Sequence, residues 1–393
     1  MDKNNYAAAV CQSPDVSQAV TQCCMLVNQR YAQTAPDLVP DLVIAFVAGY
    51  QPEDFQHAMM RIGELTNGRT VLGVTCQSLV AGNQELENTQ GISLWSACWP
   101  AAEVTPMFLE LQSEQGQANF SGLPQDGWED DSVLLMLTEA YSFPADGLLE
   151  HVNSHHPGVE IFGGVSDAGF KPSDARLMLD GNVYDRGAVA VRISGVPVST
   201  VVSQGCRPIG ESFIVTDAQR NVIGTLGGQP ALEAIKKIYA TLPTQDQARV
   251  ERGLHLGIAM TELKDKFQYG DFLIRNVIAI DEETKTITIG DYIRKGRTVQ
   301  FHIRDQVSAS IELRSMLESA TQKETTPPPA AALIFTCNGR GSNLFEQPHH
   351  DAALLKEFAG DVPTAGFFAA GEFGYVGRSN FLHGFTASIA LFQ

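Results

Sequence analysis

The hydrophobic and polar positions of the chain follow the same order three times. Each of three blocks has a short apolar run, a helical segment, a second apolar run rich in small residues, and a final apolar run. Self-similarity of this kind indicates a repeated structural unit. The runs are DLVIAFVAGY, TVLGVTCQSLVAG and GISLW in block one (41–95), DSVLLMLTEAYSF, VEIFGGVSDAGF and GAVAVRI in block two (131–193), and AALIFTCNGRG, VPTAGFFAAGEFG and GFTASIALF in block three (331–392).

The spacing inside the blocks is nearly preserved. Gly73, Gly163 and Gly366 lie 32, 32 and 35 positions after the first residue of their blocks. The first run of each block fits a strand buried on both faces, and the segment at 52–65 begins with Pro, which suits the start of a helix. Strand, crossover helix and strand form the parallel βαβ unit. The sequence therefore predicts an α/β fold of repeated βαβ-like units.

The region between blocks two and three has a different pattern. Its short stretches alternate apolar and polar residues and are separated by turn signals. Apolar residues at helical spacing predict two helices within it, at 229–242 and 305–320. We expect mixed sheets, a strand-rich central region and two α/β domains, at residues 1–205 and 206–393.

Charge and composition exclude several function classes. The formal net charge of −18, from 45 acidic and 27 basic residues, would repel nucleic-acid phosphates and anionic lipids. The N-terminus lacks the pattern of a signal peptide, and the chain has no run of 18 apolar residues. We expect a cytoplasmic protein that binds neither nucleic acid nor membranes. Its seven cysteines lack C-x-x-C spacing, which favours reduced thiols over a disulfide scaffold.

The segments rich in small residues admit two interpretations. Their glycines either allow close packing of the backbone, or form turns at the carboxyl ends of parallel strands, where open α/β sheets bind ligands. Polar residues beside these segments favour a ligand cleft lined by the three glycine turns. The predicted ligand-binding residues are Cys76, Ser78, Ser166, Cys337, Asn338, Arg340, Gly371, Glu372 and His383.

Motifs of common enzymes are mostly absent. The chain has neither G-x-x-x-x-G-K-[ST] nor H-E-x-x-H, and Ala168 replaces the last glycine of G-x-S-x-G. One set of residues remains, since Cys337, His383 and Glu372 offer a nucleophile, a base and an orienting carboxylate. Such triads are recognised by geometry, which spacing does not supply. We expect a binding protein with no catalytic residues, and a hydrolase or transferase that uses Cys337 is the alternative.

Several segments resemble the FIST C domain, and one resembles the FIST N domain. The C-terminal segments are GDFLIRNVIAID (270–281), TCNGRGSNLF (336–345), TAGFFAAGEFGYVG (364–377) and NFLHGFTASIALF (380–392), and the N-terminal one is GVTCQSLVAGN (73–83). The resemblance implies an intracellular sensory protein that binds a small ligand. Its output would pass to a separate signalling protein, such as a histidine kinase or a cyclic-dinucleotide enzyme of a two-component pathway.

The resemblance leaves two ligands open. Some stand-alone FIST proteins bind haem and sense nitric oxide, and without C-x-x-C-H a haem b would be bound noncovalently. Its iron would be ligated by His349 or His350, with His383 as the alternative. The second hypothesis is an amino-acid-like ligand, held by Arg340 on its carboxylate and by Glu372 on its amine.

Overall fold

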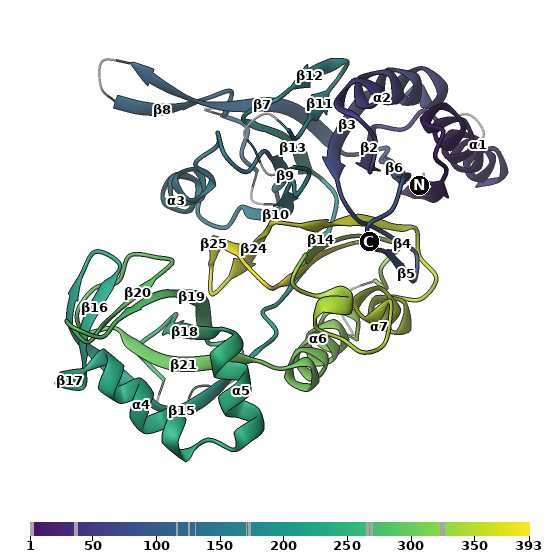
Figure 1. Cartoon of the computed structure of the whole chain (residues 1–393). Coiled ribbons are helices and arrows are strands. Elements are labelled where there is room, and N and C mark those ends of the chain that lie inside the picture. The colour runs from purple at the N-terminus through teal and green to yellow at the C-terminus, as the bar shows by residue number, and fades with distance from the viewer. Residues whose placement is uncertain are drawn as a thin grey trace. The chain divides into compact units, whose positions relative to one another are not determined.

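The structure, a computed structural model, confirms the predicted mixed α/β architecture (Figure 1). The chain forms two compact units: unit 1 comprises Met1–Val202 and Arg314–Gln393, and unit 2 comprises Ser203–Leu313. These units differ from the contiguous segments 1–205 and 206–393, because the last segment of the chain joins unit 1. The structure describes residues 4–34, 38–114, 117–124, 126–129, 131–169, 171, 174–264, 267, 270–322 and 327–393.

Unit 1 contains three copies of one structural repeat, and they correspond to the three sequence blocks. Each copy has an outer strand, a central strand, a helix, a parallel strand, a hairpin and a last strand. The first contains β1 (Asn5–Gln12), α1 (Val16–Thr34), β2 (Leu42–Ala48), α2 (Pro52–Thr66), β3 (Thr70–Cys76), β4 (Leu79–Ala81), β5 (Gln84–Leu86) and β6 (Gly91–Cys98). The second contains β7 (Glu103–Glu114), β8 (Gln117–Ser121), β9 (Val133–Thr138), α3 (Ala145–His155), β10 (Glu160–Val165), β11 (Leu177–Leu179), β12 (Asn182–Tyr184) and β13 (Ala188–Ser194). The third contains β14 (Val198–Ser203), β22 (Ala331–Cys337), η1 (Gly341–Asn343), α7 (His350–Ala359), β23 (Thr364–Ala369), β24 (Gly371–Val376), β25 (Ser379–His383) and β26 (Ala387–Phe392).

The central strands pair in the same way in each repeat. The pairs β2–β3, β9–β10 and β22–β23 are parallel, and β6, β13 and β26 lie antiparallel on the other side of the first strand. β2, β9 and β22 are buried along their whole length, as their apolar sequences predict. The βαβ prediction is therefore confirmed for all three blocks.

The glycines that mark the repeat lie inside the second strands, not in turns, so the predicted glycine turns are wrong. Gly73, Gly163 and Gly366 belong to β3, β10 and β23. A Cβ on Gly163 would come within 1.9 Å of the Met136 carbonyl oxygen, and one on Gly366 within 1.7 Å of the Ile334 carbonyl oxygen. Close approach of the backbone requires glycine at these two positions.

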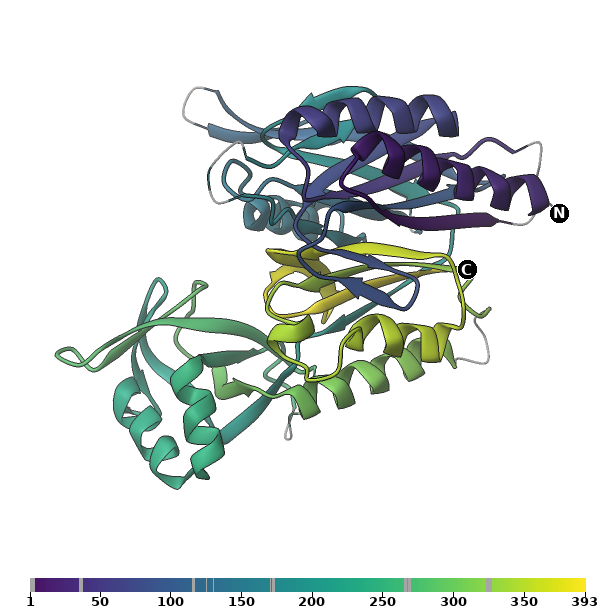
Figure 2. The same ribbon diagram turned by 45° about the vertical axis from the view of Figure 1, so that its right-hand side comes forward.

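The hairpins are exchanged among the repeats in a closed cycle. Hairpin β4–β5 of the first repeat pairs with β23 of the third, hairpin β24–β25 of the third pairs with β10 of the second, and hairpin β11–β12 of the second pairs with β3 of the first. In Figures 1 and 2 the blue β4–β5 hairpin lies beside the yellow strands of the third repeat. Each sheet of unit 1 therefore contains strands from two repeats.

Helices cover the outer faces of these sheets. α1 and α2 lie side by side over the first sheet and bury Cys23 and Phe55 against it (Figure 2). One apolar core is shared by all three sheets and contains Phe46, Phe162 and Phe335 from the first, second and third repeats. Burial of large aromatic side chains is a dominant stabilising contribution to such a core.

Unit 2 is inserted into the third repeat between β14 and β22, and it is the predicted strand-rich region. β15 pairs with β21 near its start and with β16 near its end, so the antiparallel sheet curls back on itself. The two helices predicted here correspond to α4 and α6, and α6 continues into unit 1. The elements are β15 (Cys206–Gln219), β16 (Val222–Leu226), β17 (Gln229–Pro230), α4 (Ala231–Thr241), α5 (Thr244–Arg252), β18 (Leu254–Ala259), β19 (Phe272–Asp281), β20 (Thr286–Ile289), β21 (Thr298–Arg304) and α6 (Gln306–Thr321).

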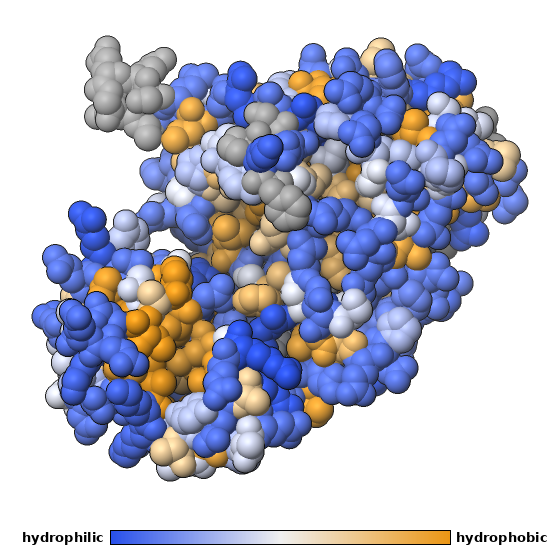
Figure 3. Space-filling view, viewed as in Figure 1, coloured by the Kyte–Doolittle hydropathy of each residue, from blue (hydrophilic) through white to orange (hydrophobic). Residues whose placement is uncertain are grey.

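The surface seen in Figure 3 is largely polar, with apolar side chains gathered over part of unit 2. Exposed large apolar residues of unit 2 include Ile214, Ile278, Ile280 and Tyr292. Among the described residues, no helix is both long enough and apolar enough to cross a membrane.

Candidate functional site

The carboxyl ends of the central strand pairs meet at one place in unit 1, which we call the junction. Ser166 Oγ of the second repeat donates a hydrogen bond to the Thr75 carbonyl of the first (2.6 Å). The Gln77 backbone N–H donates to Asp167 Oδ1 (2.9 Å), and the Asp167 side chain is also hydrogen-bonded to the side chain of Asn338 in the third repeat. The junction consists of residues 75–78, 138–139, 166–167, 337–338 and 369–371.

Backbone hydrogen bonds complete the junction. The Phe368 N–H donates to the Ser78 carbonyl (3.1 Å), and the Asn338 N–H donates to the Ala369 carbonyl (3.0 Å). Ser78 Oγ accepts from the Asn88 N–H (2.9 Å). The structure therefore brings together, at one end of the sheets, six predicted ligand-binding residues: Cys76, Ser78, Ser166, Cys337, Asn338 and Gly371.

Asp167 is the central acid of the junction, and the sequence analysis missed it. Only 7% of its surface is exposed. Burial raises the pKa of Asp167 to about 6, although hydrogen bonds from Gln77 and Asn338 act in the opposite direction. The available signal was its place beside Ser166, directly after a buried strand.

A second buried carboxyl group lies at the end of β9. Glu139 follows β9 as Asn338 follows β22, and its side chain is 1% exposed. Its Oε2 accepts hydrogen bonds from the backbone N–H groups of Tyr141 (2.9 Å) and Ser142 (2.7 Å). In the part of the chain that the structure describes, Oε1 has no hydrogen-bond partner. The junction therefore has two buried carboxyl groups.

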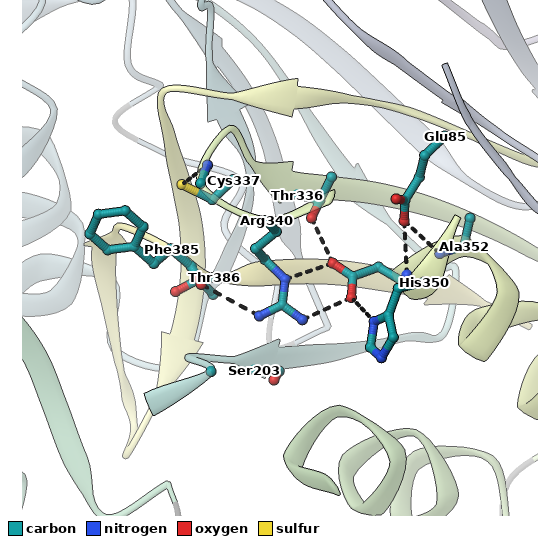
Figure 4. A network of polar contacts seen from close by, with 12 residues as sticks. Glu85, Ser203, Thr336, Cys337, Arg340, His350, Ala352, Phe385 and Thr386 are labelled. Carbon is teal, nitrogen blue, oxygen red and sulfur yellow. Dashed lines mark hydrogen bonds and ion pairs between the residues drawn. The ribbon is translucent and has the colours of Figure 1, made fainter. Parts of the chain in front are cut away.

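Arg340 lies in a separate polar cluster at the start of α7 (Figure 4). Its Nε and Nη2 donate to the two carboxylate oxygens of Asp351 at 2.6 and 2.8 Å, and both side chains are buried. Although burial acts to raise the pKa of Asp351, Arg340 holds it below the usual range. The partner of Arg340 in the structure is thus Asp351, and its role as the contact for a ligand's carboxylate stays a prediction. We call Glu85, Thr336, Arg340, His350 and Asp351 the α7 cluster.

Hairpin exchange brings Glu85 of the first repeat to the N-terminus of α7. Its Oε1 accepts hydrogen bonds from the N–H groups of Asp351 (2.8 Å) and Ala352 (3.1 Å), as Figure 4 shows. Burial, and then the negative charge of Asp351, raise the pKa of Glu85 to about 7. The sequence analysis missed Glu85, because nothing local in its hairpin points to a helix about 265 positions away in the chain.

The two adjacent histidines flank the start of α7. His349 Nδ1 accepts a hydrogen bond from the Glu85 N–H (3.0 Å). The His350 ring stacks on Phe345 with ring centroids 3.5 Å apart, and its Nδ1 lies 2.9 Å from Asp351 Oδ1. Within the described ranges, no group of three or more His, Cys, Asp or Glu side chains is arranged to hold a metal ion.

The three residues of the alternative enzyme hypothesis lie around Thr386. Glu372 pairs with His383 across the β24–β25 hairpin and accepts a hydrogen bond from the Thr386 N–H (3.1 Å). The Cys337 N–H donates to the Thr386 carbonyl (2.9 Å). His383 Nε2 lies 3.3 Å from the Gly374 carbonyl. Glu372 is fully buried, so the fold places it in the interior of unit 1.

Comparison with known proteins identifies the family. The FIST N domain model matches residues 41–229, and the FIST C domain model matches residues 231–375. The chain belongs to the FIST family. It is similar to an uncharacterized protein of Mycobacterium tuberculosis, with 38% identity over 395 positions that cover 98% of each chain. It is also similar to an uncharacterized protein of Mycobacterium bovis, with 37% identity over 386 positions that cover 98% of this chain and 97% of the relative.

Both FIST models include residues of the junction. Gln77 and Asp167 fall within the FIST N match, and Asn338 falls within the FIST C match. FIST domains indicate a sensory role in signal transduction. In this FIST protein the two matched regions therefore meet at a buried acid, and its chemistry is the basis for the proposal that follows.

Proposed function

We propose that this FIST protein is a sensor that binds a small amine-bearing metabolite, such as an amino acid, at the junction. The observation that carries the proposal is Asp167, a buried carboxyl group whose hydrogen-bond donors come from the first and third repeats. An ammonium group would supply both a positive charge and donors to such an acid. Convergent polar groups around a residue with a perturbed pKa are typical of ligand sites.

The other polar groups of the junction suit the same ligand. Glu139 supplies a second buried carboxyl group, and its Oε1 can accept a further hydrogen bond. Ser78 and Asn338 carry side chains that accept or donate hydrogen bonds to the uncharged parts of a ligand. The amine contact therefore moves from Glu372, as the sequence suggested, to Asp167.

The exchanged hairpins give the ligand a route to affect the whole unit. A ligand at the junction would contact three repeats, and each repeat contributes a hairpin to the sheet of another. Binding shifts a conformational equilibrium only when the two states differ in affinity for the ligand. A separate signalling protein, such as a histidine kinase or a cyclic-dinucleotide enzyme, would read the state that the ligand favours.

The residues do not fit haem as the ligand. A haem iron needs a histidine nitrogen directed at it and apolar walls for the porphyrin. His349 is hydrogen-bonded to the Glu85 N–H, and His350 lies against Phe345 and Asp351. The alternative ligand, His383, is buried, with its Nε2 3.3 Å from the Gly374 carbonyl. We expect protein purified from haem-supplemented cells to show no Soret band. A band that shifts with nitric oxide and disappears in His349→Ala, His350→Ala or His383→Ala would contradict this.

A ligand screen tests the proposal. Unfolding of the wild-type protein would be followed with the twenty amino acids and simple amines, since a ligand at 100 times its Kd stabilises by roughly 2.7 kcal/mol. We expect Asp167→Asn to lose the stabilisation by the ligand found. Glu64→Gln, which changes an exposed carboxylate on α2, should retain it. A wild-type protein that responds to no amine, or a full response in Asp167→Asn, would overturn the proposal.

The pH dependence provides a second readout. A bound ammonium group favours the ionised form of Asp167, so ligand affinity should rise as the pH increases through about 6. Isothermal titration calorimetry between pH 5 and 8 would measure this rise. An affinity that is constant over this range would place the ligand away from Asp167.

A further inference from the structure

A groove of about 600 Å³ follows the outer edge of β1 in unit 1. Three parts of the unit line it. They are the segment Ala7 to Val10 of β1, one face of α1 with Leu26 and Arg30, and the β4–β5 turn together with the segment before β23 (81–84 and 361–364). The groove is separate from the junction, since none of its lining residues belongs to the junction.

The backbone of β1 is available on its groove side. β1 pairs with β6 and is the end strand of its sheet. An edge strand presents backbone N–H and C=O groups to a further strand. Ala7, Ala8 and Ala9 have small side chains, and a Cβ added to Gly82 would meet no atom within 4 Å. The groove therefore has room for an extended segment beside β1.

The second repeat shows what occupies the equivalent place there. Strand register aligns β1 with β7, so that Val10 corresponds to Phe108. β8 pairs with residues 110–114 of β7, and the chain that follows it brings Gly122 beside Phe108, since a Cβ on Gly122 would lie 1.9 Å from the Phe108 carbonyl oxygen. In the second repeat, therefore, the chain itself lies against the β7 backbone at the position equivalent to Val10.

Charge indicates the chemistry of a partner at β1. Arg30 is exposed and, among the residues that the structure describes, forms no ion pair. Asp361, the acid that lines the groove, is paired with Lys356 (2.9 Å). Most of the chain's charge is negative, so a second copy of the same chain would be repelled more than a partner that brings one acid to Arg30.

We propose that an extended segment of a partner protein adds to β1 as a further strand and places one Asp or Glu side chain on Arg30. Main-chain hydrogen bonds provide affinity in this mode of recognition, and side chains that alternate along the strand provide specificity. The proposal does not depend on the ligand proposed for the junction.

Peptide selection tests the proposal directly. A displayed library of random nine-residue peptides would be selected on the full chain, and the enriched peptides would be synthesised. We expect sequences that alternate β-branched residues with polar ones and contain an Asp or Glu. Arg30→Glu should weaken their binding by about tenfold or more, and the control Arg61→Glu on α2 should not. Methylation of the peptide's backbone nitrogens should abolish binding, which a charge contact alone would not explain.

Hydrogen exchange locates the bound peptide. Amide exchange of Ala7 to Val10 should slow in the complex, because a new strand protects these groups. Enrichment of no peptide, equal binding by Arg30→Glu, or protection elsewhere than β1 would overturn the proposal. Sedimentation equilibrium of the free chain tests whether a second copy of the chain occupies the groove instead of a partner's segment. A dimer in which β1 is protected would show that it does, and would overturn the proposal.

Discussion

The junction and the α7 cluster both bury carboxyl groups between repeats, but the groups that contact these acids differ in charge. In the α7 cluster, Asp351 is ionised beside the guanidinium of Arg340, and its pKa is held below the usual range. At the junction, Asp167 has amide donors, and burial raises its pKa to about 6. A buried acid with a permanent cation maintains the fold, whereas one with neutral donors is suited to receive a cation. The same residue type therefore has a structural role in one place and supports the proposed ligand site in the other.

The sequence suggested the opposite assignment for the charged residues. Arg340 stands in the polar segment CNGRG and looked like the contact for an anionic ligand. In the structure the guanidinium of Arg340 is paired with the buried carboxylate of Asp351. Asp167, the acid at the junction, was not predicted. Substitutions in the two places should separate their roles, and the expected effects are largest in the α7 cluster.

Replacing Arg340 should cause the largest loss of stability. Arg340→Met keeps an unbranched side chain but leaves Asp351 buried without its cation, so we expect unfolding to become easier by about 3 to 5 kcal/mol. Equilibrium unfolding in urea at pH 7 measures this change. The matched control is Arg314→Met on α6, which breaks an exposed ion pair with Glu357 of α7 and should change little. If both variants lose the same small amount, Arg340 is not the structural cation.

The double variant sharpens this interpretation. Asp351→Leu alone leaves Arg340 buried without its carboxylate, and Asp351→Leu with Arg340→Met leaves neither charge. The double variant should therefore lose less than the sum of the two single losses. Additive losses would indicate that the two side chains stabilise the fold independently.

Glu85 should make stability depend on pH. Its folded pKa is raised to about 7, above its ordinary value, so the folded state favours the protonated acid. Stability should fall as the pH rises from about 4.5 to about 7, by about 3 kcal/mol in total. Glu85→Gln keeps an oxygen acceptor for the N–H groups of Asp351 and Ala352 but does not titrate. The variant should match the wild type at pH 4.5 and exceed its stability at pH 8; equal slopes for both proteins would show that folding does not shift the pKa of Glu85.

Asp167 should also make the stability fall as the pH rises, by a slightly smaller amount than Glu85. Its pKa is raised from an ordinary value near 4 to about 6, so unliganded wild type should lose stability over that pH interval, by somewhat less than Glu85 causes. Asp167→Asn should reduce this loss, and the screen described above tests whether it also loses ligand binding. Urea unfolding at pH 4 and pH 7 measures the difference. Gain of stability together with loss of binding is the signature of a functional site, whereas a structural acid would give loss of both.

Much of the fold follows from local patterns in the chain. The apolar runs predicted β2, β9 and β22, and Pro52 predicted the start of α2. The exchange of hairpins was not predictable, because β4 pairs with β23 far along the sequence and no local pattern sets that partner. The residues of the candidate site also include some that the sequence predicted and some that it did not.

The predictability of the site residues depended on their position in the repeat. Ser78, Ser166 and Asn338 were found because they are polar residues that follow apolar runs. Glu85, Glu139 and Asp167 were missed, since a lone acid in the sequence is usually solvated, and only the fold shows that these are buried. The repeated glycines do have a structural cause, but it is close packing of the backbone and not a set of turns around a ligand.

The smallest expected effect concerns Cys337, and it decides between binding and catalysis at the junction. Cys337 is the last residue of β22 and Cys76 is the last residue of β3, and both are buried. Burial raises the pKa of Cys76 well above its ordinary value, which makes its thiol unreactive. We expect iodoacetamide near neutral pH to label Cys337 as slowly as Cys76 in the native protein, with both labelled rapidly after unfolding in urea. Cys337→Ser should retain the ligand response of the wild type. Fast, selective labelling of native Cys337 that blocks turnover of an acyl substrate would instead make this residue a nucleophile, and the junction the active site of a hydrolase or transferase.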